Sequence, residues 1–193
     1  WMVGVDGGGL TKLLIPPNGA VIPIISPNGD RLTYVGSQGL RAHTMPFTPG
    51  KGVEPTELEG DGVDGKYFTP MDWSRDATRL AGYVAANNGR PAGVAVYDMA
   101  ARKTRIVSSD LAWCVKWLPD DRRMIYFTRN GAELVVLDTV TGARTRVDVR
   151  LPAPSVADVF AFAPDGRTVY YGAARAEADI WIIERGTAGA REQ

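Results

Sequence analysis

Apolar and polar residues alternate along most of the chain in short segments that are separated by turn residues, which is typical of β-strands. The segment Phe160–Tyr171 shows this pattern most clearly. Its first half alternates phenylalanine with alanine, and Pro164 ends it because proline cannot donate to a strand ladder. Asp165-Gly166 is a strong tight-turn pair, and the β-branched and aromatic residues from Val169 onward return as a second strand. The segment therefore predicts a β-hairpin.

The same hairpin pattern occurs three more times upstream. In each copy a large apolar residue, the anchor, stands just before the turn. The anchors are Ile25, Trp73, Trp117 and Phe162, and they lie 48, 44 and 45 residues apart. A regular period of about 45 residues is the length of one four-stranded blade of a β-propeller. The chain is therefore predicted to be all-β, with about four four-stranded blades.

The period also predicts how the chain is divided. The predicted units are a partial blade over 1–14, blades over 20–58, 62–107, 111–149 and 156–185, and a polar tail over 186–193. A strand over Trp1–Val5 and a returning strand over Leu10–Leu14 make up the partial blade. Since Trp1–Val5 would duplicate the strand Asp179–Ile183, we expect the chain to be the C-terminal part of a propeller of roughly six to eight blades.

The hairpin motif also resembles a known repeat. Pro-Asp-Gly after an aromatic anchor, then Arg-x-apolar-x-Tyr, then a strand such as Asp179–Ile183, resembles the WD40-like (PD40) repeat of TolB-type β-propellers. The resemblance extends from Trp1 to Arg185 and is most complete in the last unit. The turns of the second and third units depart from it, as Arg75-Asp76-Ala77 and Pro119-Asp120-Asp121. The motif is specific for architecture and unspecific for function.

The resemblance implies a set of expected roles. TolB-type propellers occur in the Tol–Pal envelope system, as sensor or scaffold regions behind bacterial serine/threonine kinases, and as gating domains of prolyl-oligopeptidase-type hydrolases. We therefore expect a non-catalytic module that binds a protein or small ligand at the propeller mouth, as the sensor or scaffold portion of a larger bacterial protein. The alternative is the accessory propeller of a multidomain enzyme, a kinase or hydrolase whose catalytic domain lies outside this chain. An extracytoplasmic location is implied, either periplasmic or in a membrane-anchored protein.

Composition narrows the class of partner. The chain has 22 basic and 22 acidic residues and a formal net charge of zero, so no net field favours nucleic acid or anionic lipid. The hydrophobic fraction of 45% is ordinary for a globular chain. No apolar run reaches the roughly 20 residues that a membrane span needs. We expect neither nucleic-acid binding nor a membrane span in this chain.

Catalytic and metal-binding patterns are missing from the sequence. It contains no nucleophile elbow, no kinase glycine-rich loop and a single histidine, His43, so we expect no catalytic residue, no cofactor and no metal. The single cysteine, Cys114, stands among hydrophobic residues and is predicted to be a buried structural thiol.

The acidic loop Glu59–Gly65 suggests a calcium site as one hypothesis. Val63 occupies a ligand position and Pro70 stands where the closing glutamate belongs, which favours a plain connection.

Two charged residues interrupt the predicted inner strands. Asp72 and Lys116 each immediately precede a tryptophan anchor in adjacent units, where Ile24 and Ala161 hold the equivalent position elsewhere. We predict that the two charges either pair between neighbouring blades or line the central channel. A structural pair is favoured over a ligand site.

Overall fold

The computed structural model describes residues 3–10, 19–37, 41–47, 54–86, 88–128, 133–148, 156–162 and 168–174. These residues form 15 strands in four antiparallel sheets. The predicted all-β fold is confirmed. Within these ranges no helix is long and apolar enough to cross a membrane.

The strands are arranged in each sheet in the order of the chain. The first sheet contains β1 (Ala20–Ile25), β2 (Arg31–Gly36), β3 (Ala42–Pro46) and β4 (Thr56–Glu57). The second contains β5 (Gly62–Val63), β6 (Lys66–Trp73), β7 (Arg79–Ala85), β8 (Pro91–Asp98) and β9 (Lys103–Ser108). The third contains β10 (Ala112–Trp117), β11 (Arg123–Thr128), β12 (Leu134–Asp138) and β13 (Arg144–Val147). The fourth contains β14 (Val156–Phe162) and β15 (Val169–Ala174).

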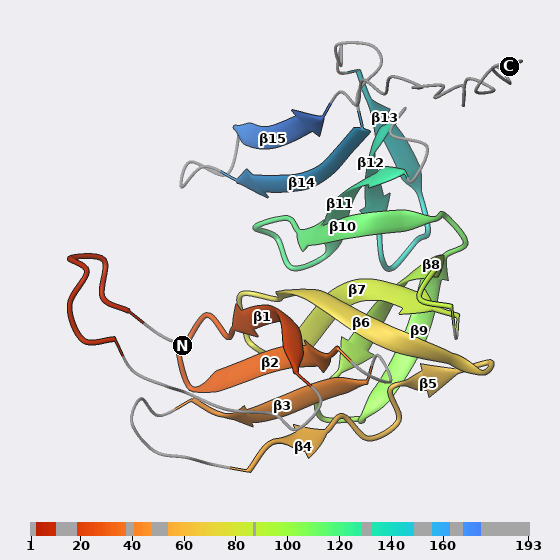
Figure 1. The fold of residues 1–193 in the computed structure, drawn as a ribbon. Helices are drawn as coiled ribbons and strands as arrows, with labels where there is room; N and C mark the ends of the chain where they lie inside the picture. The colour runs from red at the N-terminus through yellow and green to blue at the C-terminus, as the bar shows by residue number, and fades with distance from the viewer. Residues whose placement is uncertain are drawn as a thin grey trace, which may run out of the picture.

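The four sheets follow one another around an arc, and β1, β6, β10 and β14 lie next to one another along its inner side (Figure 1). Each of these inner strands has a shift of register against its partner. The shifts lie between Val21 and Ile24, Pro70 and Asp72, Ala112 and Val115, and Ala157 and Val159. A β-bulge of this kind increases the local twist of a strand. The repeat is therefore preserved in backbone detail as well as in strand order.

The alternating side chains of each strand serve two different cores. Leu80 and Val84 of β7 pack in a core shared with the first sheet, whereas Ala81 packs in a core shared with the third. In β11, Met124 faces the second sheet and Ile125 faces the fourth. The second and third sheets are each covered on both faces by their neighbours, as in other repeat architectures.

The hairpins β1–β2, β6–β7 and β10–β11 share one backbone geometry. In each, the N–H of the residue after the anchor donates to the carbonyl five positions on. The bonds are Ser26–Arg31 at 2.9 Å, Ser74–Arg79 at 2.9 Å and Leu118–Arg123 at 2.8 Å. The turn residues with positive φ are Gly29 (74°), Ala77 (56°) and Asp121 (51°). The turns that depart from the sequence motif therefore keep its shape.

The second sheet has one strand more than predicted. Asp64 and Gly65 both have positive φ, 51° and 71°, and this two-residue turn folds β5 back onto β6. The acidic segment 59–65 is thus part of a hairpin rather than a plain connection between sheets.

The strand predicted over Trp1–Val5 is wrong for the residues of that segment that are described. Gly4 donates its N–H to Gly8 and Gly7 donates to Gly4, both at 2.8 Å, so residues 4–8 form a closed turn. Val3 and Val5 are exposed, and no apolar face supports a strand there. The segments 11–14, 163–167 and 179–183, on which other predicted strands and a turn fall, lie outside the described residues.

Candidate functional site

Neighbouring sheets meet at contacts that can be compared position by position. We name the contact between the first and second sheets the first junction, and the contact between the second and third sheets the second junction. Because the hairpins share one geometry, Arg31 in the first junction corresponds to Arg79 in the second, and Ala77 corresponds to Asp121. The two junctions differ at these positions.

Arg79 closes the second junction. One of its guanidinium nitrogens donates to the Asp121 carbonyl at 2.8 Å, and the guanidinium lies over the Trp117 ring, 4.8 Å from its centroid. The Asp121 carboxylate accepts the Arg75 backbone N–H at 2.7 Å. The carboxylate of Asp76, on the same hairpin as Arg79, lies 3.7 Å from the guanidinium. Stacking and hydrogen bonds thus join the two hairpins across this junction.

The first junction keeps a tryptophan, Trp73, in the place of Trp117, but it lacks three of the other residue types that surround Arg79. Asn28 stands in place of Asp76, Ala77 in place of Asp121, and Pro27, which has no N–H, in place of Arg75. Within the described part of the chain, the Arg31 guanidinium makes no hydrogen bond or ion pair; its bonds are made by its backbone. The first junction is therefore left open beside a positive charge.

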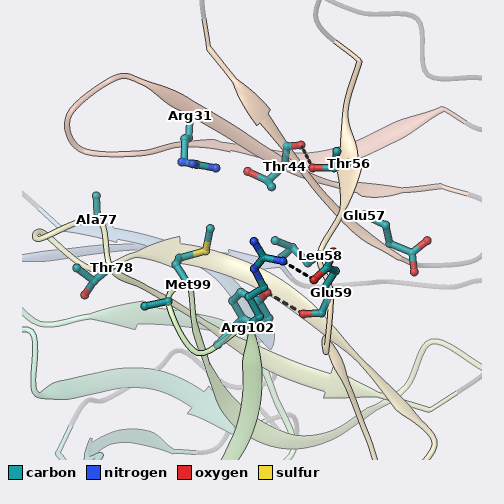
Figure 2. Close-up of a pocket in the computed structure, with 12 residues that line it drawn as sticks. Arg31, Thr44, Thr56, Glu57, Leu58, Glu59, Ala77, Thr78, Met99 and Arg102 are labelled. Carbon is teal, nitrogen blue, oxygen red and sulfur yellow. Dashed lines mark hydrogen bonds and ion pairs between the residues drawn. The ribbon is translucent and has the colours of Figure 1, made fainter.

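A cavity of about 570 Å³ occupies the open junction (Figure 2). Cavities of roughly 300–1,000 Å³ are the usual size of ligand pockets. The first sheet contributes Arg31, Thr44 and Thr56 to its lining, and two turns of the second sheet contribute Thr78, Met99 and Arg102. Figure 2 shows Arg31 on one side of this space, with Met99 and Arg102 facing it from the other.

The two carboxylates of the cavity lining are already paired. Glu59 forms an ion pair with Arg102 at 2.6 Å, and Glu57 forms one with Arg41 at 2.9 Å. Tyr97 donates its hydroxyl to the Glu59 carbonyl at 2.8 Å, which holds this end of the connection in place. Arg31 is thus the lining residue whose charge is unpaired among the described residues.

Asp72 and Lys116, the residues singled out from the sequence, lie together on the inner strands. Lys116 Nζ is 3.3 Å from Asp72 Oδ1 and donates to the Met71 carbonyl at 3.0 Å. The other carboxylate oxygen accepts the Trp117 N–H at 2.9 Å. Burial raises the pKa of Asp72 above its ordinary value, against the opposing effect of the Lys116 charge. The two residues join β6 to β10 across the second junction, and a channel or ligand role for them stays a prediction.

Other residues considered from the sequence have structural contacts. The His43 ring is stacked on Tyr34 with centroids 5.2 Å apart, and its Nδ1 lies 3.0 Å from the Arg41 carbonyl oxygen. Cys114 is buried in the core between the third and fourth sheets, as predicted. Asp61 is buried and paired with Arg41 at 3.0 Å, and burial raises its pKa. In the described ranges no group of three His, Cys, Asp or Glu side chains is arranged to hold a metal ion.

Sequence reasoning missed the first junction as a site. The repeated arginine at positions 31 and 79 was visible, and so was the change from Ala77 to Asp121 in the turn. Each looked like ordinary repeat variation, because nothing in one unit says which residue of the next unit it faces. The sequence alone does not show that Arg31 and Ala77 border one cavity.

Solved structures identify the fold. TolB from Acinetobacter baumannii superposes with a TM-score of 0.66 at 16% identity, over 88% of this chain and 41% of that chain. A putative TolB from Agrobacterium tumefaciens gives 0.64 at 17% identity, over 82% and 55%. The β-propeller domain of Cps50 (Swd1) from Myceliophteria thermophila gives 0.58 at 14%, over 82% and 50%. No protein-family model and no curated protein sequence matches the chain.

These likenesses establish the fold and no more. The chain has the β-propeller fold of TolB-type and WD40 proteins, which confirms the predicted resemblance at the level of architecture. The chain spans 41% and 55% of the length of the two TolB structures. The arc of sheets in Figure 1 is consistent with part of a propeller.

Proposed function

We propose that this protein is a non-catalytic binding module, and that a segment of a partner protein occupies the cavity at the first junction. The observation that carries the proposal is a cavity of about 570 Å³ at a junction whose counterpart, one sheet along, is closed by Arg79 and Asp121. A repeat that normally closes with side chains, and does not close at one place, offers a preformed space on a rigid scaffold.

The lining of the cavity suits a peptide better than a chemical reaction. Thr56 and Thr78 line the cavity; their hydroxyls donate within the chain, to the Thr44 carbonyl at 3.3 Å and to Asp76 Oδ1 at 2.7 Å, and can still accept a hydrogen bond. Met99 offers an adaptable apolar contact. Among the described residues the cavity lining contains no histidine or cysteine to serve as base or nucleophile. We therefore propose that any catalysis in the whole protein belongs to another domain.

The larger setting is part of the same proposal. The resemblance to TolB-type repeats supports a bacterial, extracytoplasmic protein in which this propeller is a sensor or scaffold. An accessory propeller beside a kinase or hydrolase domain remains the competing proposal. The gene that encodes the whole protein distinguishes the two, because a kinase or hydrolase domain would be encoded in the same reading frame.

Peptide selection with matched variants tests the binding role. Random twelve-residue peptides are selected on the immobilised chain, and the affinity of the selected peptides is measured by fluorescence anisotropy. Ala100→Trp places a large ring at the cavity from an exposed turn. Val140→Trp is the matched control, because Asp98 and Asp138 cap the two turns alike, at 2.9 Å to the N–H of Ala100 and of Val140.

We expect Ala100→Trp to weaken peptide binding by about tenfold or more, and Val140→Trp to leave it unchanged, since interface anchors act through filled pockets. Both substitutions stand at exposed positions, so both variants are expected to melt within about 2 °C of the unmodified chain. If no peptide is selected, or if the peptides bind Ala100→Trp as tightly as the unmodified chain, the proposal is wrong.

A further inference from the structure

We infer that the cavity at the first junction recognises an acidic side chain of the partner segment, and that the Arg31 guanidinium pairs with its carboxylate. The inference rests on the proposed binding role and adds the chemistry of the ligand. It follows from comparing the two hairpins, because the carboxylate of Asp76 lies 3.7 Å from the Arg79 guanidinium, whereas Arg31 has Asn28 in that place.

The arginine of each hairpin needs partners that only one junction supplies. Arg79 has a carbonyl at 2.8 Å, a carboxylate at 3.7 Å and an indole ring beneath it. Arg31 has the same place in its own hairpin, but Asn28 and Ala77 offer no carboxylate. A guanidinium is always charged and forms its strongest hydrogen bonds with carboxylates in a two-pronged geometry. The first junction thus keeps the arginine and lacks the acid.

The charges around the cavity favour an incoming carboxylate. Both lining glutamates are already held by arginines, Glu59 by Arg102 and Glu57 by Arg41. Arg31 is therefore the cation that a ligand meets with its charge unpaired among the described residues.

The apolar part of the cavity indicates that the acid belongs to a protein segment. Leu58 and Met99 line the same space as Arg31. Leu58 is already packed in the core, but Met99 is half-buried, and a free dicarboxylate would leave Met99 uncovered, whereas an extended peptide presents an acidic residue beside apolar neighbours. The assignment is therefore to aspartate or glutamate within a peptide chain.

A double-mutant cycle between chain and peptide tests the assignment. Among the peptides selected on the unmodified chain we expect enrichment of Asp or Glu. For one such peptide, affinity is measured with the acid and with its amide replacement, against the unmodified chain and Arg31→Gln. The amide replacement in the peptide and Arg31→Gln in the chain are each expected to weaken binding by about tenfold. Combining them is expected to weaken binding little further, because the guanidinium and the carboxylate act as a pair. Arg75→Gln, an exposed arginine outside the cavity lining, is the control for general charge and is expected to change affinity less than twofold.

Three results would overturn the inference while the proposed binding role stands. These are selected peptides that carry no acid, an Arg31→Gln variant that still distinguishes the acidic peptide from its amide, and free glutarate that binds as tightly as the peptide. In each case Ala100→Trp would still weaken peptide binding. The inference is supported if Arg31→Gln binds the acidic peptide and its amide replacement equally well and keeps an unchanged melting temperature. Free glutarate must also bind at least tenfold more weakly than the peptide.

Discussion

The first and second junctions are built on the same backbone and closed by different side chains. Both bring a hairpin arginine to the turn of the next sheet, at Ala77 in one case and Asp121 in the other. In the second junction the arginine is stacked on Trp117 and bonded to Asp121, and in the first it borders a cavity. The difference shows that turn geometry maintains the repeat, while each junction is closed or left open by a few side chains of its own.

The open end of the first junction does not make the whole contact weak. Its core contains Trp73, Leu80 and Tyr97, which are buried together with residues of the first sheet. In addition, the Thr104 hydroxyl of β9 donates to the carbonyl of Asp61, just before β5, at 3.0 Å. Apolar burial of this kind is the main stabilising term in a repeat interface. A binding cavity can therefore exist at this junction without loss of the fold.

The largest expected effect comes from the tryptophan of the closed junction. Trp117→Ala is expected to lower the free energy of unfolding by about 3–5 kcal/mol, because it empties a buried site. Trp73→Ala, equally buried, is expected to cost about 0.5–1 kcal/mol less, since only Trp117 carries the Arg79 guanidinium in the described part of the chain. Urea unfolding followed by circular dichroism measures both.

Trp117→Phe is the control for shape. Its buried indole N–H has no acceptor among the described residues, so the replacement loses packing and no hydrogen bond. We expect a cost of about 1 kcal/mol. If Trp73→Ala proved costlier than Trp117→Ala, the idea that the second junction is the more tightly closed of the two would be untenable.

The next effect concerns the inner strands of the second junction. Asp72→Ala leaves Lys116 and the Trp117 N–H without their partner, and we expect a loss of about 2 kcal/mol in the free energy of unfolding. The double variant with Lys116→Ala is expected to recover about 1 kcal/mol relative to the sum of the single changes. Purely additive losses would reject the predicted pairing.

The pH dependence of Asp72 follows from its burial. Because burial raises the pKa of Asp72 in the folded protein, the folded state holds this proton more tightly than the unfolded chain does. The resulting stability is fully present below the unfolded pKa of about 3.9 and is lost as the pH rises through the higher folded pKa. Asp72→Asn removes this titration. The free energy of unfolding of the unmodified chain, relative to that of Asp72→Asn, should therefore fall as the pH rises from the unfolded to the folded pKa of Asp72. A rise over the same pH range would contradict the raised pKa.

The architecture could be predicted from the sequence because its signals are local and recur in each repeat. Turn residues, alternation and the spacing of the anchors from Ile25 to Phe162 each point to the same hairpin, and the folded hairpins agree with them. The prediction failed where local signals were ambiguous. Val3 and Val5 look like strand residues, but the glycines at 4 and 7 allow a closed turn instead. The extra strand β5 depends on positive φ at Asp64, which sequence alone does not fix.

The site could not be predicted in the same way, because it depends on which residues of neighbouring sheets face each other. Asp72 and Lys116 were noticed since charge is unusual next to a tryptophan anchor, and the structure brings them within 3.3 Å. Arg31 does not stand out in the sequence, since an arginine after a turn is ordinary. Its importance comes from the cavity that it shares with Ala77, 46 residues away in the chain.

The smallest expected change in stability, and the most direct test of the comparison, exchanges the two turn residues. Ala77→Asp gives the first junction the residue type of the second at a positive φ of 56°, which aspartate tolerates better than alanine. Position 27 is proline and has no N–H to offer, so we expect the new carboxylate to pair with Arg31. Stability should rise by about 0.5 kcal/mol, and binding of acidic peptides should fall by about tenfold, because the chain then supplies its own acid.

Asp121→Ala makes the opposite exchange and should cost about 1 kcal/mol, through the lost bond to the Arg75 N–H and the less favourable backbone conformation of alanine. Asp121→Asn keeps both an acceptor and the tolerance for positive φ, so it should lie close to the unmodified chain. Thermal unfolding and peptide anisotropy measure the four proteins side by side. If Ala77→Asp bound acidic peptides as tightly as the unmodified chain, the missing acid would not be what the cavity recognises, and the two junctions would differ in stability alone.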